Sequence, residues 1–170
     1  MGELSFRTLF SALNASGCRY VIVGGLAVIL HGHARLTTDT DLVVDLAAGE
    51  LSDFLSVLGG LGFKPRVPVE LQDFADAEKR NYWQREKGMQ VFSVFHPDQP
   101  RWVIDLFVNS PLDFSRLVEC SVSKQIETVE VRVASVDDLI EMKRMAGREI
   151  DRTDIEWLEQ IKEVVGEYRV

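Results

Sequence analysis

The chain has 170 residues, of which 46% are hydrophobic, and it carries a formal net charge of −8. That length and apolar content suit one packed core, so we predict a single domain over residues 1–170. The negative charge argues against a protein that coats nucleic acid through a general basic surface, because that mode needs many Lys and Arg side chains facing phosphates. A local basic groove remains compatible with this balance.

The cysteines and the hydropathy favour a reducing compartment. Cys18 and Cys120 lie within or beside apolar segments, and we expect two reduced core thiols rather than a disulfide. No segment resembles a signal peptide, and no apolar run is long enough to span a bilayer. We therefore expect a cytoplasmic protein with no membrane partner.

The chain opens with a helix, a strand and a glycine turn. Apolar residues recur at helical spacing over residues 6–13, and residues 14–17 end that helix. Residues 20–23 form an apolar strand that runs into Gly24 and Gly25. Paired glycines let a backbone approach a ligand closely, and the free N–H groups of a following helix attract anions such as phosphate.

A short apolar helix precedes a second strand, which follows Arg35, carries Asp39 and Asp41 and runs to about Val44. Two carboxylates two residues apart on a strand point to the same face, where they can share a hard cation. The alternative is that both acids only cap a turn before the strand. A phosphate cradle beside a divalent-metal site indicates phosphoryl or nucleotidyl transfer.

The middle of the chain alternates helical and extended patterns. Residues 51–58 have helical spacing and end at glycines, and residues 63–67 form a short extended piece. The polar stretch 70–87 is predicted to be a surface helix or an ordered excursion. Residues 89–95 and 101–108 are apolar runs with a turn-rich connector, so we expect an antiparallel hairpin.

The C-terminal part adds one strand and two helices. Residues 128–133 alternate as a strand does, and Ser135 with Asp138 begins a helix that runs to about Gly147. A last helix places its apolar residues on one face over 155–165. We predict an α+β fold in which a mixed central β-sheet is flanked by helices and followed by a C-terminal helical pair.

Asp105 is the third acid of interest, because it lies inside an apolar strand run. An unpaired carboxylate there would cost several kcal/mol or stay protonated. A strand adjacent to Asp39 and Asp41 would bring three carboxylates together, and they would repel one another until a divalent cation binds. The alternative is an Asp105 paired with an Arg or with backbone amides.

Several charged residues are candidates for phosphate contacts. Lys143 lies on the apolar stripe of its helix, where a triphosphate is a natural partner and snorkelling of its stem is the alternative. Arg35 can contact phosphate or pair with an acid, and Arg148 can contact phosphate or favour a helix C-terminus. Asp151 and Asp154 are interpreted as the N-cap and third residue of the last helix.

Gly24-Gly25, Asp39-Thr40-Asp41 and Asp105 together resemble the pattern of the polymerase-beta-like nucleotidyltransferase superfamily: a glycine pair or Gly-Ser, then Asp-x-Asp, then a later strand Asp. A wider set of positions is similar to the small bacterial branch related to AbiEii-type toxins. These positions are 24–32, Arg35, Thr37, 39–44, 134–139, Lys143, 146–148, Asp151 and Asp154. The resemblance covers most of the chain and is weakest over residues 59–87. It implies a minimal nucleotidyltransferase fold and a single nucleotidyltransferase-like domain.

The resemblance also implies a reaction. Asp39, Asp41 and Asp105 would hold two Mg²⁺ ions, and Asp105 would help to deprotonate an acceptor hydroxyl that attacks the α-phosphate of a nucleoside triphosphate, releasing pyrophosphate. Gly24 and Gly25 would cradle the β- and γ-phosphates. Lys143 would match a lysine that the toxin branch uses near the phosphates.

These residues do not specify the chemical identity of the acceptor. Candidates are tRNA, a protein, or a small molecule such as an aminoglycoside or a lincosamide, and a cationic antibiotic would suit the acidic balance of the chain. The alternative function is a catalytically silent protein that binds nucleotide or a partner, as in a toxin–antitoxin pair with a cognate antitoxin. Retention of all three acids argues against that alternative.

Overall fold

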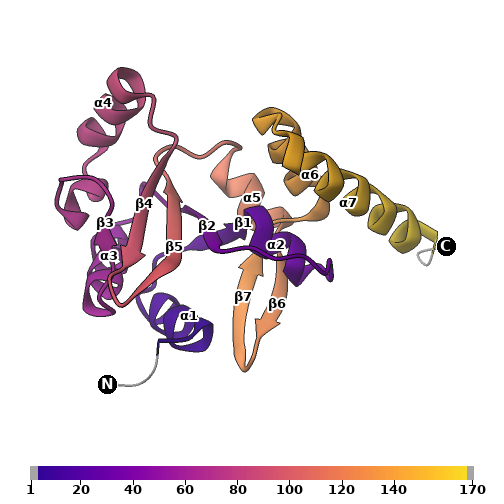
Figure 1. Cartoon of the computed structure of the whole chain (residues 1–170), viewed down its shortest axis with the longest axis horizontal. Coiled ribbons are helices and arrows are strands. Elements are labelled where there is room, and N and C mark those ends of the chain that lie inside the picture. Colours follow the sequence, from indigo (N-terminus) through magenta and orange to yellow (C-terminus); the bar gives the residue numbers. More distant parts are fainter. Residues whose placement is uncertain (1–3, 168–170) are drawn as a thin grey trace.

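The computed structural model describes residues 4–167, which form one mixed sheet in the strand order β3-β4-β5-β2-β1-β7-β6 (Figure 1). The strands are β1 (Tyr20–Val23), β2 (Asp39–Val44), β3 (Lys64–Pro65), β4 (Val91–His96), β5 (Gln99–Phe107), β6 (Val122–Ile126) and β7 (Val129–Val133). Strand β2 runs parallel to β5, and β1 runs parallel to β7. The other neighbouring strands are antiparallel.

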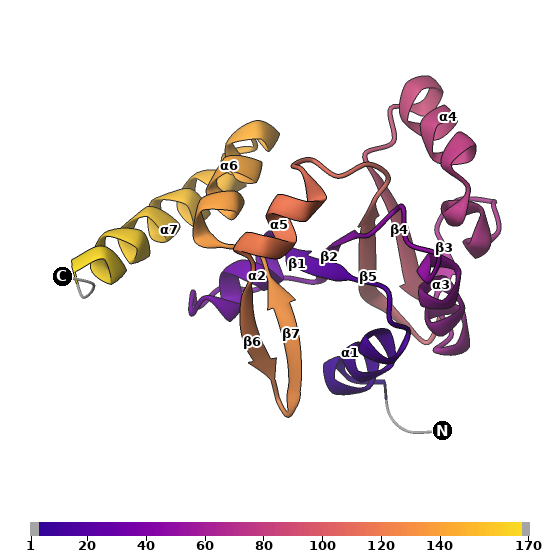
Figure 2. The ribbon, with the colours of Figure 1, turned by 180° about the vertical axis from the view of Figure 1, so that it is seen from behind.

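Helices flank this sheet, and the last two form a pair at one end of the molecule (Figures 1 and 2). The helices are α1 (Phe6–Ala15), α2 (Gly24–Leu30), α3 (Leu51–Gly60), the 3-10 helix η1 (Leu71–Ala75), α4 (Ala77–Lys87), α5 (Phe114–Cys120), α6 (Val136–Ala146) and α7 (Glu149–Glu167). The predicted α+β class, with a mixed sheet and a C-terminal helical pair, is confirmed.

The two faces of the β4–β5 hairpin differ in burial. Alternate residues are buried on one face: Phe92, Val94, Ile104 and Leu106. Phe74 of η1 and Trp83 of α4 pack on Phe92, each with ring centroids 5.3 Å apart. The intervening residues, Val91, Ser93, Phe95, Asp105 and Phe107, are only partly buried. We call the face formed by these five residues the open face.

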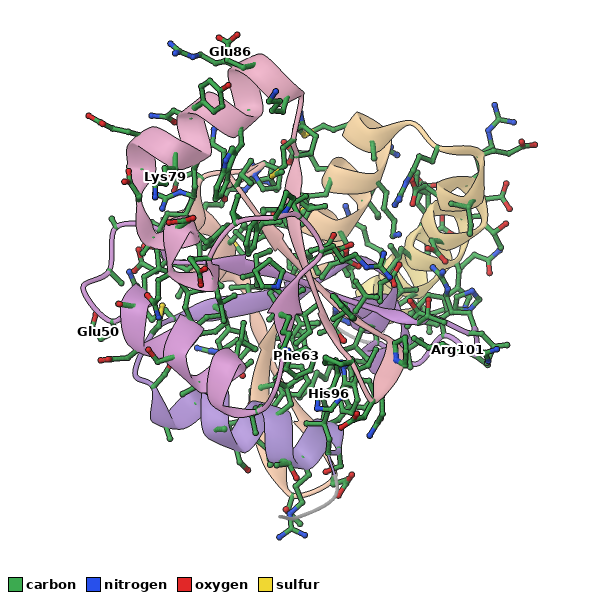
Figure 3. The ribbon with its side chains drawn as sticks, turned by 60° about the vertical axis from the view of Figure 1, so that its left-hand side comes forward. Glu50, Phe63, Lys79, Glu86, His96 and Arg101 are labelled. Carbon is green, nitrogen blue, oxygen red and sulfur yellow. The ribbon has the colours of Figure 1, made fainter. Side chains whose placement is uncertain are left out.

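Most local predictions are confirmed, because they depend on neighbouring residues. Ser135 caps α6 by accepting a hydrogen bond from the Asp138 backbone N–H at 3.1 Å, and Gly147 ends that helix with a φ of 63°. The stretch 70–87 is an ordered excursion, as predicted, but it also contributes Phe74 and Trp83 to the core. Figure 3 shows Glu86 projecting from the far end of α4, whereas Lys79 pairs with Asp73 of η1 at 2.5 Å.

The sequence analysis missed α5 and β6, and it placed one thiol wrongly. Only Leu117 of α5 and Ile126 of β6 are buried, so neither element has a strong apolar period. Cys18 is buried and Cys120 is exposed, and neither forms a disulfide. The prediction of two core thiols is therefore wrong for Cys120, which ends a helix on its solvent side. Within residues 4–167, no helix combines the length and the hydropathy needed to cross a bilayer.

Candidate active site

Asp41 and Asp105 are neighbours on parallel strands. The register of β2 and β5 sets the Asp41 Cα opposite the Asp105 Cα. On the other side, Ser93 of β4 is opposite Asp105, and its hydroxyl donates to Asp105 Oδ1 at 2.5 Å. Register partners on adjacent strands present their side chains to the same face. The prediction that the strand of Asp105 lies beside that of Asp41 is confirmed.

The glycine pair lies directly against Asp41. Gly24 has a φ of +66°, which is the left-handed region that glycine adopts without strain. A Cβ on Gly24 would stand 2.2 Å from Asp41 Oδ2, and a Cβ on Gly25 would stand 2.8 Å from the Thr37 hydroxyl. Glycine at these positions therefore lets the start of α2 approach the carboxylate.

The environment of Asp41 disfavours its ionised form. Burial raises the pKa of Asp41 to about 7, and repulsion from Asp105 and Asp39 acts in the same direction. Arg148 and Lys143 oppose this shift in pKa, but they do not outweigh it. A carboxylate in this position is stabilised by any cation that can reach it.

Asp105 has a related but separate environment. Burial raises the pKa of Asp105, and the hydrogen bond from Ser93 opposes that shift. Asp39 raises the pKa of Asp105 further, and Arg66 lowers it. Different basic residues therefore act on the two carboxylates: Lys143 and Arg148 on Asp41, and Arg66 on Asp105.

A cavity of about 540 Å³ opens above the two carboxylates. Gly24, Asp41 and Asp105 line one side of it, and Lys143 and Arg148 line the α6 side. Most of the remaining lining is apolar, from residues that include Val91, Phe107, Pro111, Leu139 and Met142. The cavity combines carboxylates, cations and an apolar wall within one space.

Lys143 is buried, and carboxylates of α7 are its partners. Its ammonium donates to Asp154 Oδ2 at 2.8 Å and to Asp151 Oδ1 at 3.2 Å. Arg148 donates to Asp151 Oδ2 at 2.9 Å, and Arg35 donates to the same Asp154 oxygen as Lys143. We call these five residues the Lys143 network.

The Lys143 network corrects one interpretation. Asp151 and Asp154 are not an N-cap and its third residue, because α7 begins at Glu149 and both carboxylates pair with cations instead. A buried ammonium needs such partners, and packing of α6 on α7 supplies them. Lys143 does lie on the buried stripe of α6, as predicted, and it also borders the cavity.

Arg35 and Asp39 lie at the edge of the site rather than in it. The cavity lining includes neither residue. The Arg35 guanidinium carbon would be 3.4 Å from a Cβ on Gly25, so Arg35 stands beside the glycine turn. Asp39 is exposed, and its Oδ1 accepts a hydrogen bond from the Thr38 hydroxyl at 3.3 Å. The structure therefore brings Asp41 and Asp105 together and leaves Asp39 at the rim.

The donor set is compatible with a hard divalent cation. Among residues 4–167, no group of three or more His, Cys, Asp or Glu side chains forms a metal site by itself. Mg²⁺, however, usually takes only one or two protein carboxylates and completes its shell with waters and substrate phosphates. Asp41 and Asp105, two facing carboxylates whose pKa values are raised, fit that requirement.

Sequence comparisons and structural comparisons give different outcomes. No family model matches the chain, and a search of curated proteins finds no significant match. The crystal structure of the lincosamide antibiotic adenylyltransferase LnuA, lincomycin-bound, aligns with a TM-score of 0.59 at 16% identity, covering 94% of this chain and 99% of LnuA. The solution structure of the antibiotic-resistance factor ANT(2'')-Ia aligns with a TM-score of 0.54 at 14% identity, covering 96% of this chain and 88% of that one. The chain therefore shares its fold with these two proteins.

Proposed function

We propose that this protein is a metal-dependent nucleotidyltransferase that moves a nucleoside monophosphate from a triphosphate to a hydroxyl acceptor. One observation carries the proposal: Asp41 and Asp105 lie side by side on parallel strands and line one cavity, with Gly24 against Asp41 and two cations lining the same cavity. The fold shared with a lincosamide adenylyltransferase supports the general class.

The triphosphate would lie on the Asp41 side of the cavity. Gly24 and Gly25 allow its β- and γ-phosphates to approach the backbone at the start of α2. Lys143 and Arg148 line the opposite wall and would offset the phosphate charge. Arg35 stands beside Gly25, so it would contact the outer phosphates from the rim.

Asp41 and Asp105 would hold Mg²⁺ as two ions, with Asp39 contributing from the rim. When bound, the ions would stabilise negative charge on the transferring phosphoryl group and on the leaving pyrophosphate. Asp105 would accept the proton of the acceptor hydroxyl on Oδ2, because Oδ1 already accepts from Ser93. The acceptor oxygen would then bond to the α-phosphorus as the bond to pyrophosphate breaks.

The acceptor and the branch of the family belong to the same proposal. Similarity at Lys143, 146–148, Asp151 and Asp154 favours the small bacterial branch related to AbiEii-type toxins, for which tRNA or a protein is an acceptor and an antitoxin is a partner. The likeness to LnuA instead favours a small-molecule hydroxyl. Either activity suits a cytoplasmic enzyme made of one domain.

A direct test is transfer of label from each α-³²P nucleoside triphosphate, with Mg²⁺, to total tRNA, to a protein extract and to panels of aminoglycosides and lincosamides. We expect one acceptor to be labelled by the wild type and not by Asp41→Asn. Asp98→Asn is the matched control, since Asp98 is an exposed acid in the β4–β5 turn.

A second candidate function is a silent protein that binds nucleotide without transferring it. The rim position of Asp39 favours this alternative, because only two of the three acids line the cavity. Binding of nucleotide without transfer to any acceptor would support it over the enzyme.

A further inference from the structure

Asp41 and Asp105 interact electrostatically with different basic residues, so the site has an Asp41 side and an Asp105 side. Lys143 and Arg148 act electrostatically on Asp41, whereas Arg66 acts on Asp105. The Arg66 backbone N–H donates to the Ser93 carbonyl at 3.0 Å, which continues the β3–β4 pairing beyond Pro65. Arg66, Ser93, Asp105 and Asp41 thus form one row across four neighbouring segments of the sheet.

Arg66 is exposed and lacks a strong partner. In the described part of the chain, its guanidinium takes part in no hydrogen bond and no salt bridge. Every cation of the Lys143 network, by contrast, is paired with an aspartate. Arg66 is not among the residues that line the cavity, so its unpaired guanidinium acts on Asp105 from beside the cavity and is available to a bound molecule.

Two further exposed cations lie on neighbouring segments of the sheet. Lys64 begins β3, two residues before Arg66, and Arg101 lies near the start of β5. Neither forms a salt bridge among residues 4–167. Figure 3 shows Arg101 projecting outward from β5.

The proposed reaction assigns Arg66 to the acceptor. The triphosphate occupies the Asp41 side, so the acceptor hydroxyl must reach Asp105 from the open face. Phe107 lies two residues beyond Asp105 on that face and offers a flat apolar surface. A group attached close to the reacting hydroxyl would therefore lie near Phe107 on one side and Arg66 on the other.

We propose that the acceptor carries a phosphate beside its reacting hydroxyl and that Arg66 binds this phosphate. The inference rests on the proposed function. A guanidinium matches phosphate because it donates two parallel hydrogen bonds. The phosphate belongs either to a small phosphate ester, such as a nucleoside monophosphate, or to the end of a single-stranded RNA.

Acceptor binding tests the inference without requiring turnover. The protein is saturated with Mg²⁺ and a non-hydrolysable nucleoside triphosphate, and is then titrated with a labelled single-stranded oligoribonucleotide, a nucleoside monophosphate or an aminoglycoside. We expect a phosphate-bearing ligand to bind, and Arg66→Ala to weaken that binding by about tenfold or more. Arg66→Lys should recover part of the affinity, because it restores the positive charge but not the planar guanidinium that donates two parallel hydrogen bonds.

The control is Arg7→Ala, which removes an exposed cation from α1. Arg7→Ala should leave the affinity for the phosphate-bearing ligand and the affinity for the triphosphate unchanged. Arg66→Ala should leave the affinity for the triphosphate unchanged. Tighter binding of the oligoribonucleotide than of the monophosphate, with a steep salt dependence, identifies an RNA end as the source. The reverse order identifies a small phosphate ester.

Two results would overturn the inference, and they differ in what else they affect. If label passes from triphosphate to a cationic or neutral acceptor equally well in wild type and Arg66→Ala, the acceptor inference is wrong and the transferase stands. If the wild type fails to bind the triphosphate at all, the proposed function fails and the acceptor inference fails with it.

Discussion

The Asp41 carboxylate occupies the space in which a Cβ on Gly24 would lie, since Oδ2 is 2.2 Å from that position. The first residue of α2 and the third residue of β2 are therefore mutually dependent. Because Val23 and Asp41 are register partners, neither strand can shift to relieve the overlap without breaking the sheet. The glycine is thus required by the carboxylate itself.

Gly24→Ala should abolish triphosphate binding and lower stability. It introduces both a positive-φ alanine, which costs roughly 1 kcal/mol, and a clash with Asp41. Calorimetric titration with a triphosphate and thermal unfolding measure the two effects. Gly88→Ala is the matched control, because Gly88 has a φ of +63° and no atom within 4 Å of its would-be Cβ. Normal triphosphate binding by Gly24→Ala would contradict the proposed phosphate cradle.

Asp41→Asn should stabilise the metal-free protein above neutral pH. The pKa of Asp41 is raised to about 7 by burial, so the folded state retains a proton that the unfolded state loses at lower pH. Stability contributed by the protonated carboxyl is therefore lost as the pH rises from about 4 to about 7. In EDTA, the melting temperature of Asp41→Asn should exceed that of the wild type at about pH 8 and match it at about pH 4. An equal difference at both pH values would contradict this account.

Mg²⁺ should stabilise the wild type more than it stabilises Asp41→Asn. A cation that binds only the folded state raises its stability, and Asp41 is one of the two carboxylates facing the cavity. At about pH 8, added Mg²⁺ should raise the melting temperature of the wild type more than that of Asp41→Asn. Asp98→Asn should respond to Mg²⁺ as the wild type does. The same rise in Asp41→Asn would place the ion elsewhere.

Asp154→Asn should be strongly destabilising. It leaves the buried Lys143 ammonium with Asp151 alone and removes the partner of Arg35. Removing one member of a buried ion pair costs about 3 kcal/mol or more, measurable by urea unfolding. Asp137→Asn breaks an exposed pair with Lys162 and should cost about 1 kcal/mol at most. Similar losses in the two variants would show that the Lys143 network contributes little to stability.

Trp83→Ala should show that α4 belongs to the core. Trp83 is 8% exposed and stacks on Phe92 with an interplanar angle of 9°. Truncating a buried aromatic of this kind costs about 3 kcal/mol or more. The adjacent Tyr82 is 49% exposed, so Tyr82→Ala should change the free energy of unfolding by about 0.5 kcal/mol or less. If Trp83→Ala changes the free energy of unfolding as little as Tyr82→Ala does, α4 does not contribute to the core.

Local order along the chain was sufficient to predict the elements that surround the site. Strand β1 has the predicted bounds, β2 carries Asp39 and Asp41 as predicted, and α6 begins and ends at its predicted cap residues. Periodicity, glycines and side-chain caps act over a few residues, so one sequence contains all of that information. The spacing of Asp39 and Asp41 likewise predicts that both acids lie on one side of a strand.

Partners that are distant in the chain could be identified only from the folded molecule. The pairing of Asp41 with Asp105, of Lys143 with Asp151 and Asp154, and the approach of Arg66 to Asp105 all depend on sheet register or helix packing. A shift of one residue in the β2–β5 pairing would remove Asp105 from Asp41, and no local pattern specifies that register. The sequence therefore determines which carboxylates and cations are present and where each lies in its helix or strand. Tertiary packing determines which of them are in contact, because the partners of a carboxylate depend on distance in space and not on distance along the chain.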